Sequence, residues 1–338
     1  LHGQVLSSSI VLLSGTIILL YILYFPPKGQ FMEVLVVLFH YGQYQPLWQQ
    51  PSLIQAGPKI PNTAQSVNVP KPSIELLKDR LAIHYPNRKY VLIHYTDPYY
   101  IKDRPLLNLK DWHWPSILAC GDLHHGKDPI LTLSTYLSIQ SHDAVILTFN
   151  PFLLDEVRSH ISIPVNSFPP SFFKYASATN HDPPIQALIH IGTIDRYHKK
   201  RREVVNGIND RNHIPFLHCE TESAESAAKI YSKYAVALNI PLNKDLNHRF
   251  FEIMAAGVPQ IIFGSKKIIG PHEDLANRQD IFWSNSIEEV EYTTNKILSD
   301  RESLPPINVL PPPYIPLNRL IKESFMVYKA NDRIYQFG

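Results

Sequence analysis

The segment at 247–256 combines residues that could hold a nucleotide. Asn247 is a helix N-cap residue, and Gly257 marks the helix end, so the helix is short and well bounded. A helix N-terminus offers unpaired N–H groups and a partial positive charge, which suit a diphosphate. Glu252, about one turn further along, can accept hydrogen bonds from both hydroxyls of a ribose. The same spacing also fits a plain surface pair of Arg249 and Glu252 on an amphipathic helix.

A second polar cluster, CGDLHHGKDP, follows the apolar run at 116–120. One interpretation makes His124 or His125 a general base, or a hydrogen-bond donor to a sugar. A second makes the segment a structural loop, with Asp122 capping the backbone. A third is a metal site, because Gly-Asp-x-His-x-Gly resembles the first metal box of the metallophosphoesterases. That family has further boxes downstream, and the Gly-Asn-His box is missing from this sequence.

Basic residues gather after another predicted strand, in the segment GTIDRYHKKRR at 192–202. Gly192 allows a ligand to approach the backbone closely. Lys200, Arg201 and Arg202 are candidates for phosphate contact, and at least two of the three must face solvent on a helix. The formal net charge is only +2 and no aromatic platform accompanies the run, so we expect no nucleic-acid partner.

Two weaker candidates also follow predicted strands. Gly42 comes after the opening strand and would let the backbone approach an acceptor, and Ser265 could line a donor pocket. Since ligands bind at the carboxyl ends of parallel strands, these loops should share one edge of a sheet. A tight turn at each position is the alternative.

Short continuous apolar runs alternate with helix-like segments along the chain, which predicts an α/β fold with two doubly wound, Rossmann-like domains facing a cleft. The predicted strands lie at 33–39, 90–95, 116–120, 144–149, 187–191, 214–218, 234–239 and 259–263. The predicted helices lie at 72–84, 129–140, 151–159, 198–209, 222–231, 247–256 and 286–299, with a last helix at about 317–329. The proline-broken stretches at 44–71 and 303–316 are expected to wrap the surface.

The predicted domain organisation has five parts. A hydrophobic segment at 1–31 precedes an acceptor-side domain at 32–175, a linker at 176–186, a donor-binding domain at 187–316, and a C-terminal helix and tail at 317–338 that returns to the first domain. Residues 5–25 carry no charge and are long enough to cross a bilayer as a helix. They predict either a membrane anchor or an extension ahead of a start at Met32. Cys120 and Cys219 are expected to be free thiols.

The stretches YSKYAVALNI, NHRFFEIMAAGVPQII and PHEDL resemble the donor-binding half of the group 1 glycosyl transferases, especially their spore-maturation-protein-like branch. That branch has an Arg-x-Phe-Glu-x-x-Ala-x-Gly helix after a strand ending in Asn. The matching residues are Asn239, Arg249, Phe251, Glu252, Ala255 and Gly257.

The resemblance implies a GT-B enzyme that transfers a sugar from a nucleotide-diphosphate sugar to a hydroxyl of a glycan, lipid or small-molecule acceptor. It implies Glu252 on the ribose, and His248, Arg249 and the 199–202 cluster on the diphosphate. No metal or other cofactor is expected, and the protein is expected in the cytoplasm, with possible anchoring at the inner face of the membrane.

One position departs from the family pattern, because Lys244 stands where many retaining relatives carry a sugar-binding glutamate. A retaining transfer is the expectation, and the departure leaves the donor and the stereochemistry open. A non-catalytic nucleotide-sugar-binding protein is the main alternative, and a metallophosphoesterase using Asp122, His124 and His125 is the other.

Overall fold

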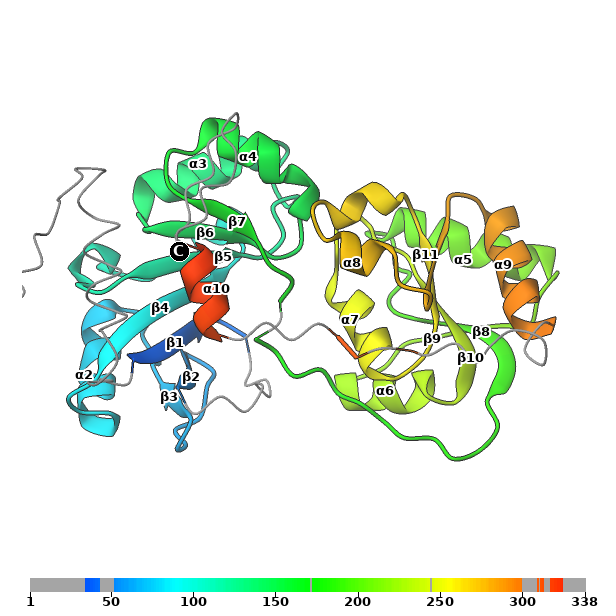
Figure 1. The fold of residues 1–338 in the computed structure, drawn as a ribbon, viewed down its shortest axis with the longest axis horizontal. Coiled ribbons are helices and arrows are strands. Elements are labelled where there is room, and N and C mark those ends of the chain that lie inside the picture. Colours follow the sequence, from blue (N-terminus) through cyan, green and yellow to red (C-terminus); the bar gives the residue numbers. More distant parts are fainter. Residues whose placement is uncertain are drawn as a thin grey trace, which may run out of the picture.

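The computed structural model describes residues 34–42, 52–170, 172–243, 245–299, 309, 311–312 and 317–324. These residues form two separate parallel β-sheets, each flanked by helices (Figure 1). The predicted α/β class with two parallel sheets is therefore confirmed. In the part of the chain that the structure describes, no helix is both long and apolar enough to span a membrane, and the predicted anchor at 5–25 lies outside that part.

The first sheet has the strand order β3-β2-β1-β4-β5-β6-β7, with every neighbouring pair parallel. Its strands are β1 (Val34–His40), β2 (Leu53–Gly57), β3 (Ser66–Asn68), β4 (Lys89–Thr96), β5 (Ser116–Cys120), β6 (Ala144–Leu147) and β7 (Val165–Ser167).

The assignment of 44–71 to a surface wrap was wrong where the structure describes this stretch. Strands β2 and β3 lie there and extend the sheet beyond β1. Pro58 and Pro61 lie between the two strands and interrupt neither ladder, while Leu53, Ile54 and Val67 are buried in the core. The prolines therefore bound these short strands instead of excluding them.

Helices cover both faces of the first sheet. Helix α2 (Ile74–His84) begins at Ser73 and α3 (Pro129–Ile139) at Asp128, whose side chains accept the N–H groups of Leu76 and Leu131. Helix α4 (Leu154–His160) follows a 3₁₀ turn at Pro151–Leu153. The C-terminal α10 (Leu317–Ser324) lies against β6 and β7, and its Leu320 is 1% exposed (Figure 1).

The second sheet has the order β12-β11-β10-β8-β9 and is also parallel. Its strands are β8 (Ile185–Ile191), β9 (Phe216–Cys219), β10 (Tyr234–Asn239), β11 (Gln260–Phe263) and β12 (Ile281–Ser284). Its helices are α5 (Lys199–Arg211), α6 (Ala224–Tyr231), α7 (His248–Ala255), α8 (Glu273–Ala276) and α9 (Ile287–Ser299).

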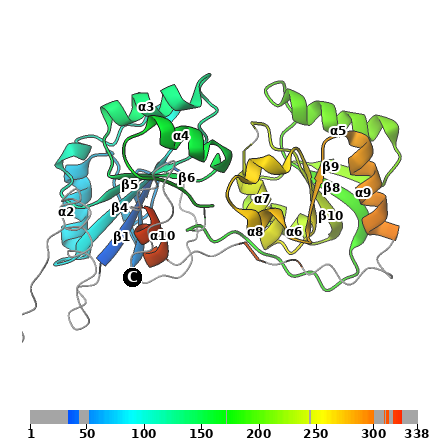
Figure 2. The ribbon, with the colours of Figure 1, turned by 45° about the horizontal axis from the view of Figure 1, so that its top comes forward.

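The two units meet through α7, α8 and the loops beside them, which border the first unit in both views (Figures 1 and 2). The Leu246 amide donates to the Phe149 carbonyl at 2.7 Å, and Ser167 Oγ lies 2.9 Å from His272 Nε2. Gly270 has φ +57°, and a Cβ there would lie 2.6 Å from the Pro151 backbone. A glycine is thus required for this close approach.

Candidate functional site

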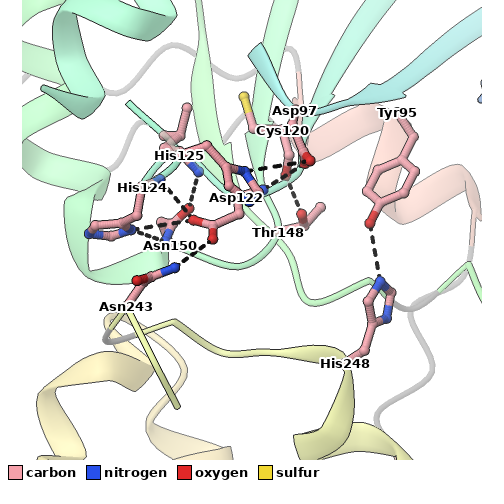
Figure 3. Close-up of polar contacts among 11 residues, drawn as sticks. Tyr95, Asp97, Cys120, Asp122, His124, His125, Thr148, Asn150, Asn243 and His248 are labelled. Atoms are coloured by element: carbon pink, nitrogen blue, oxygen red, sulfur yellow. Dashed lines mark hydrogen bonds and ion pairs between the residues drawn. The ribbon is translucent and has the colours of Figure 1, made fainter. Parts of the chain in front are cut away.

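The candidate site lies where the carboxyl ends of β4, β5 and β6 meet the loop before α7 (Figure 3). Asp97, Asp122 and Asn150 come from the first unit, and Asn243 and His248 come from the second. The parallel strands bring these loops to one edge, as in other open α/β sheets.

Both carboxylate oxygens of Asp122 accept hydrogen bonds from other residues of the protein. Oδ1 accepts the backbone N–H of His124 at 2.8 Å, and Oδ2 accepts Nδ2 of Asn243 at 3.0 Å across the junction between the units. Burial alone would raise the pKa of Asp122, but hydrogen bonds from His124 and Asn243 outweigh burial and hold the pKa below its ordinary value. This geometry favours a structural and tethering role for Asp122 over a metal-binding one.

Asp97 is a site residue that the sequence analysis missed. Its Oδ1 accepts the backbone N–H of Asp122 at 2.9 Å. A Cβ on Gly121 would lie 1.7 Å from the same oxygen, so this hydrogen bond requires glycine at position 121. Burial raises the pKa of Asp97, although the hydrogen bond from Asp122 opposes the shift. The only sequence signal for Asp97 was that it is a carboxylate directly after β4, and β4 pairs with β5, the strand that precedes the predicted loop.

His124 and His125 differ in how far neighbouring residues engage their side chains. Nδ1 of His124 lies 2.9 Å from Asn150 Nδ2, and its ring stacks on Phe152. Nδ1 of His125 lies 3.7 Å from Oδ2 of Asp97, and the His125 side chain is 38% exposed. His125 is therefore the histidine that is better placed to meet a substrate, with Asp97 beside its ring.

No group of three His, Cys, Asp or Glu side chains is arranged to hold a metal ion within the described ranges. The cysteines of these ranges are free, and Cys120 is buried.

Arg201 is the member of the basic run that points inward. It is 7% exposed, whereas Lys200 and Arg202 on either side are exposed. Its Nη1 donates to the Thr193 carbonyl at 2.9 Å, and its Nε is buried with no hydrogen-bond partner among the described residues. Burial lowers the pKa of Arg201 to about 10, and the nearby Arg249 charge adds to the shift.

Arg249 reaches the same place from α7. Its guanidinium covers Gly192, where a Cβ would lie 2.6 Å from Nη1, and Gly192 has φ +146°. The Nε of Arg249 is also buried without a partner in the described part of the chain. Neither Arg201 nor Arg249 forms a direct ion pair with a carboxylate in that part, although Asp245 acts electrostatically on Arg201 and Arg249 acts on Glu252 from further away.

A neutral histidine borders this arginine pair. His190 is fully buried, its Nδ1 lies 2.9 Å from Nδ1 of His218, and its Nε2 has no partner among the described residues. Burial lowers the pKa of His190 to about 2, with the Arg249, His218 and Arg201 charges adding to the shift. Three buried polar atoms in this region, Nε of Arg201, Nε of Arg249 and Nε2 of His190, thus have no hydrogen-bond partner among the described residues.

Glu252 and Asn239 differ in burial and in hydrogen bonding. Glu252 is half-buried; its backbone carbonyl accepts the Ala256 N–H, and its carboxylate accepts no hydrogen bond from the described residues. Burial raises the pKa of its carboxyl, while Arg249 opposes the shift. Asn239 is fully buried, and its side chain exchanges hydrogen bonds of 3.3 and 3.2 Å with Asn247, the N-cap of α7. Asn239 therefore positions the helix start and is not itself exposed to a ligand.

The two remaining predicted residues, Ser265 and Gly42, are both exposed. Ser265 caps the 3₁₀ turn at Lys266–Ile269, and Gly42 lies beyond the end of β1.

His248 joins the two units. Its Nε2 lies 3.2 Å from the Tyr95 hydroxyl (Figure 3). Its Nδ1 lies 3.0 Å from the Tyr175 hydroxyl. In a neutral imidazole one nitrogen donates and the other accepts, so both tyrosines can be satisfied together. Burial lowers the pKa of His248 to about 4. Its ring is therefore engaged at the junction, while its backbone remains at the start of α7.

We expect acid to weaken this junction. The His248 pKa is about 4 in the folded chain against 6.5 for the free side chain. The folded state therefore binds fewer protons, and the stability that His248 contributes is complete above pH 6.5 and declines as the pH falls toward 4. His248→Gln keeps a donor and an acceptor but cannot take up a proton, so its free energy of unfolding should fall less steeply over this range. Urea titrations at several pH values would measure both slopes, and equal slopes would contradict the assignment.

Comparisons with known proteins give no family assignment. No protein-family model matches the chain, and no curated protein matches it. Among solved structures, the sucrose-phosphate synthase (tll1590) from Thermosynechococcus elongatus superposes with a TM-score of 0.47 at 9% identity, over 79% of this chain and 90% of that one. TarM gives 0.45 at 9% identity, over 70% of this chain and 49% of TarM. The pneumococcal O-GlcNAc transferase GtfA in complex with UDP and GlcNAc gives 0.37 at 10% identity, over 63% of this chain and 50% of GtfA. These likenesses are too low to carry a functional argument.

Proposed function

We propose that this chain is a GT-B glycosyltransferase that moves a sugar from a nucleoside-diphosphate sugar to a hydroxyl acceptor. The observation that carries the proposal is the arginine pair over Gly192, because Arg201 and Arg249 each bury an unpartnered Nε there. Buried charges are normally paired, so an anionic ligand is the natural partner for these two arginines.

A diphosphate fits this arginine pair better than a single carboxylate would. Two guanidinium groups and the N-terminus of α7 can share the charge of several phosphoryl oxygens. Glu252 lies about one turn along the same helix, with an uncommitted carboxylate that can accept the two hydroxyls of a ribose. A nucleoside diphosphate supplies both of these groups.

The acceptor side is assigned to Asp97 and His125, across the junction from the arginine pair. The acceptor oxygen would form the new bond to the anomeric carbon while the bond from that carbon to the diphosphate breaks. The electron pair leaves with the diphosphate, whose charge Arg201 and Arg249 would stabilise. The proton of the acceptor would pass to Nε2 of His125, with Asp97 holding the ring from the Nδ1 side.

The first test is a ligand panel on the full chain. We expect at least one of UDP, GDP, ADP, dTDP and their common sugar conjugates to raise the thermal unfolding temperature, because a ligand that binds only the folded state stabilises it. Inorganic sulfate at equal ionic strength serves as the control for nonspecific anion effects. A panel in which no nucleotide exceeds sulfate would overturn the proposal, and binding without turnover of any conjugate would favour a non-catalytic binding protein.

A further inference from the structure

Two tyrosines, Tyr99 and Tyr100, form a small aromatic platform with the His125 ring, and the transfer described above uses neither tyrosine. Tyr99 and Tyr100 belong to a 3₁₀ turn, Pro98–Tyr100, directly after Asp97. The rings of Tyr99 and Tyr100 lie 5.2 Å apart, and the His125 ring lies 6.2 Å from Tyr99 and 5.3 Å from Tyr100. Two separate loops therefore contribute three rings to one patch.

Of the two tyrosines, Tyr99 is the more exposed, so its ring is the one that a ligand can contact. Tyr99 is 51% exposed, whereas Tyr100 is half-buried and the Arg104 guanidinium lies 4.8 Å from the centre of its ring. The Tyr100 and His125 rings lie beside Tyr99, and Nδ1 of His125 lies 3.7 Å from Oδ2 of Asp97, so the exposed ring belongs to the same cluster as the Asp97 carboxylate. A supported aromatic ring beside a hydrogen-bond acceptor can bind a ligand that is apolar on one face and polar at its rim.

We propose that this platform is the acceptor subsite and that it takes a pyranose. A sugar ring presents a face of C–H groups, which packs on the electron-rich face of an aromatic ring, and hydroxyls at its edge, which can donate to Asp97. The inference rests on the proposed transferase function, and it selects a carbohydrate from the glycan, lipid and small-molecule acceptors considered above.

The surroundings disfavour two other acceptor classes. An alkyl chain needs a continuous apolar surface, whereas the patch also holds the His125 ring beside Tyr99, the Arg104 guanidinium over Tyr100 and the Asp97 carboxylate near His125. An acceptor held by a phosphate group would meet the carboxylates of Asp97 and Asp122 close to the same position. An uncharged sugar ring needs no continuous apolar surface and is not repelled by the carboxylates.

The test uses the full chain and the methyl pyranosides of glucose, galactose, mannose and N-acetylglucosamine. Saturation-transfer NMR should detect at least one of them, and Tyr99→Ala should raise its dissociation constant about tenfold, which corresponds to about 1.4 kcal/mol, because alanine removes the exposed ring face on which the sugar packs. Tyr99→Phe should retain binding. Tyr292→Ala removes a tyrosine that is 71% exposed on α9 and should have no effect.

Three results would overturn the platform: no pyranoside bound, equal binding by wild type and Tyr99→Ala, or Tyr99-dependent binding of decyl phosphate alone. Thermal shifts with the nucleotide panel on the same samples separate this inference from the transferase proposal. A nucleotide shift without pyranoside binding rejects only the platform. Tyr99-dependent pyranoside binding without any nucleotide shift supports the platform and rejects the donor site.

Discussion

Replacing Arg201 by methionine is expected to weaken nucleoside-diphosphate binding by about 10- to 100-fold, because a hydrogen bond to a charged group contributes about 1.5–3 kcal/mol. Methionine keeps much of the apolar stem and removes only the guanidinium. Isothermal titration with the nucleotide that binds best in the panel would measure the change.

The unliganded protein should tolerate this substitution. Arg201 is 7% exposed and its Nε is unpartnered among the described residues, so its charge is desolvated without full compensation. We therefore expect the melting temperature without ligand to stay the same or rise. Arg202→Met is the matched control, because Arg202 is the next residue of α5 and is exposed. An equal loss of affinity in both variants would show that only general positive charge matters.

Replacing Glu252 by alanine is expected to abolish recognition of the ribose. The wild-type chain should prefer a ribonucleoside diphosphate to its 2′-deoxy form by about tenfold or more, because the deoxy form cannot fill a buried carboxylate acceptor. In Glu252→Ala the ratio should fall close to one. Measuring both nucleotides with both proteins isolates the coupling between Glu252 and the 2′-hydroxyl.

The stability of the Glu252 variants provides an internal check. Burial raises the pKa of Glu252, so the folded state holds its proton more tightly than the unfolded state does. Its contribution to stability is therefore largest at low pH and declines as the pH rises through the folded pKa. Glu252→Gln should accordingly be as stable as the wild type, or more so, at pH 7.5.

Glu273→Ala on α8 is the control for ribose recognition, because it removes an exposed carboxylate and should leave the ribose preference unchanged. A preserved preference in Glu252→Ala would reject the ribose assignment.

The strands that could be predicted are those whose sequence is a continuous apolar run. β1, β4, β5 and β6 are buried on both faces, and each run was visible without knowledge of its neighbours. β3 and β7 have only three residues each, too few for a pattern, and they form because an adjacent strand already offers a ladder. Their existence depends on pairing between segments.

The loops of the candidate site were predictable because ligands bind at the carboxyl ends of parallel strands, and the sequence shows where those strands end. The choice among Lys200, Arg201 and Arg202 was not, because it depends on the rotation of α5 against its sheet. That rotation buries Arg201 and exposes its two neighbours.

Two α/β units, a capped helix with one carboxylate, and a basic loop after β8 can be read from the sequence, since each follows from local propensity and apolar pattern. Which of these groups contact one another depends on the packing of the folded chain. The pairing of β4 with β5 brings Asp97 to Asp122, 25 residues away, and the packing of α5 and α7 around β8 brings Arg201 to Arg249. Contacts between distant segments depend on sheet order and helix rotation, which no local stretch of sequence encodes.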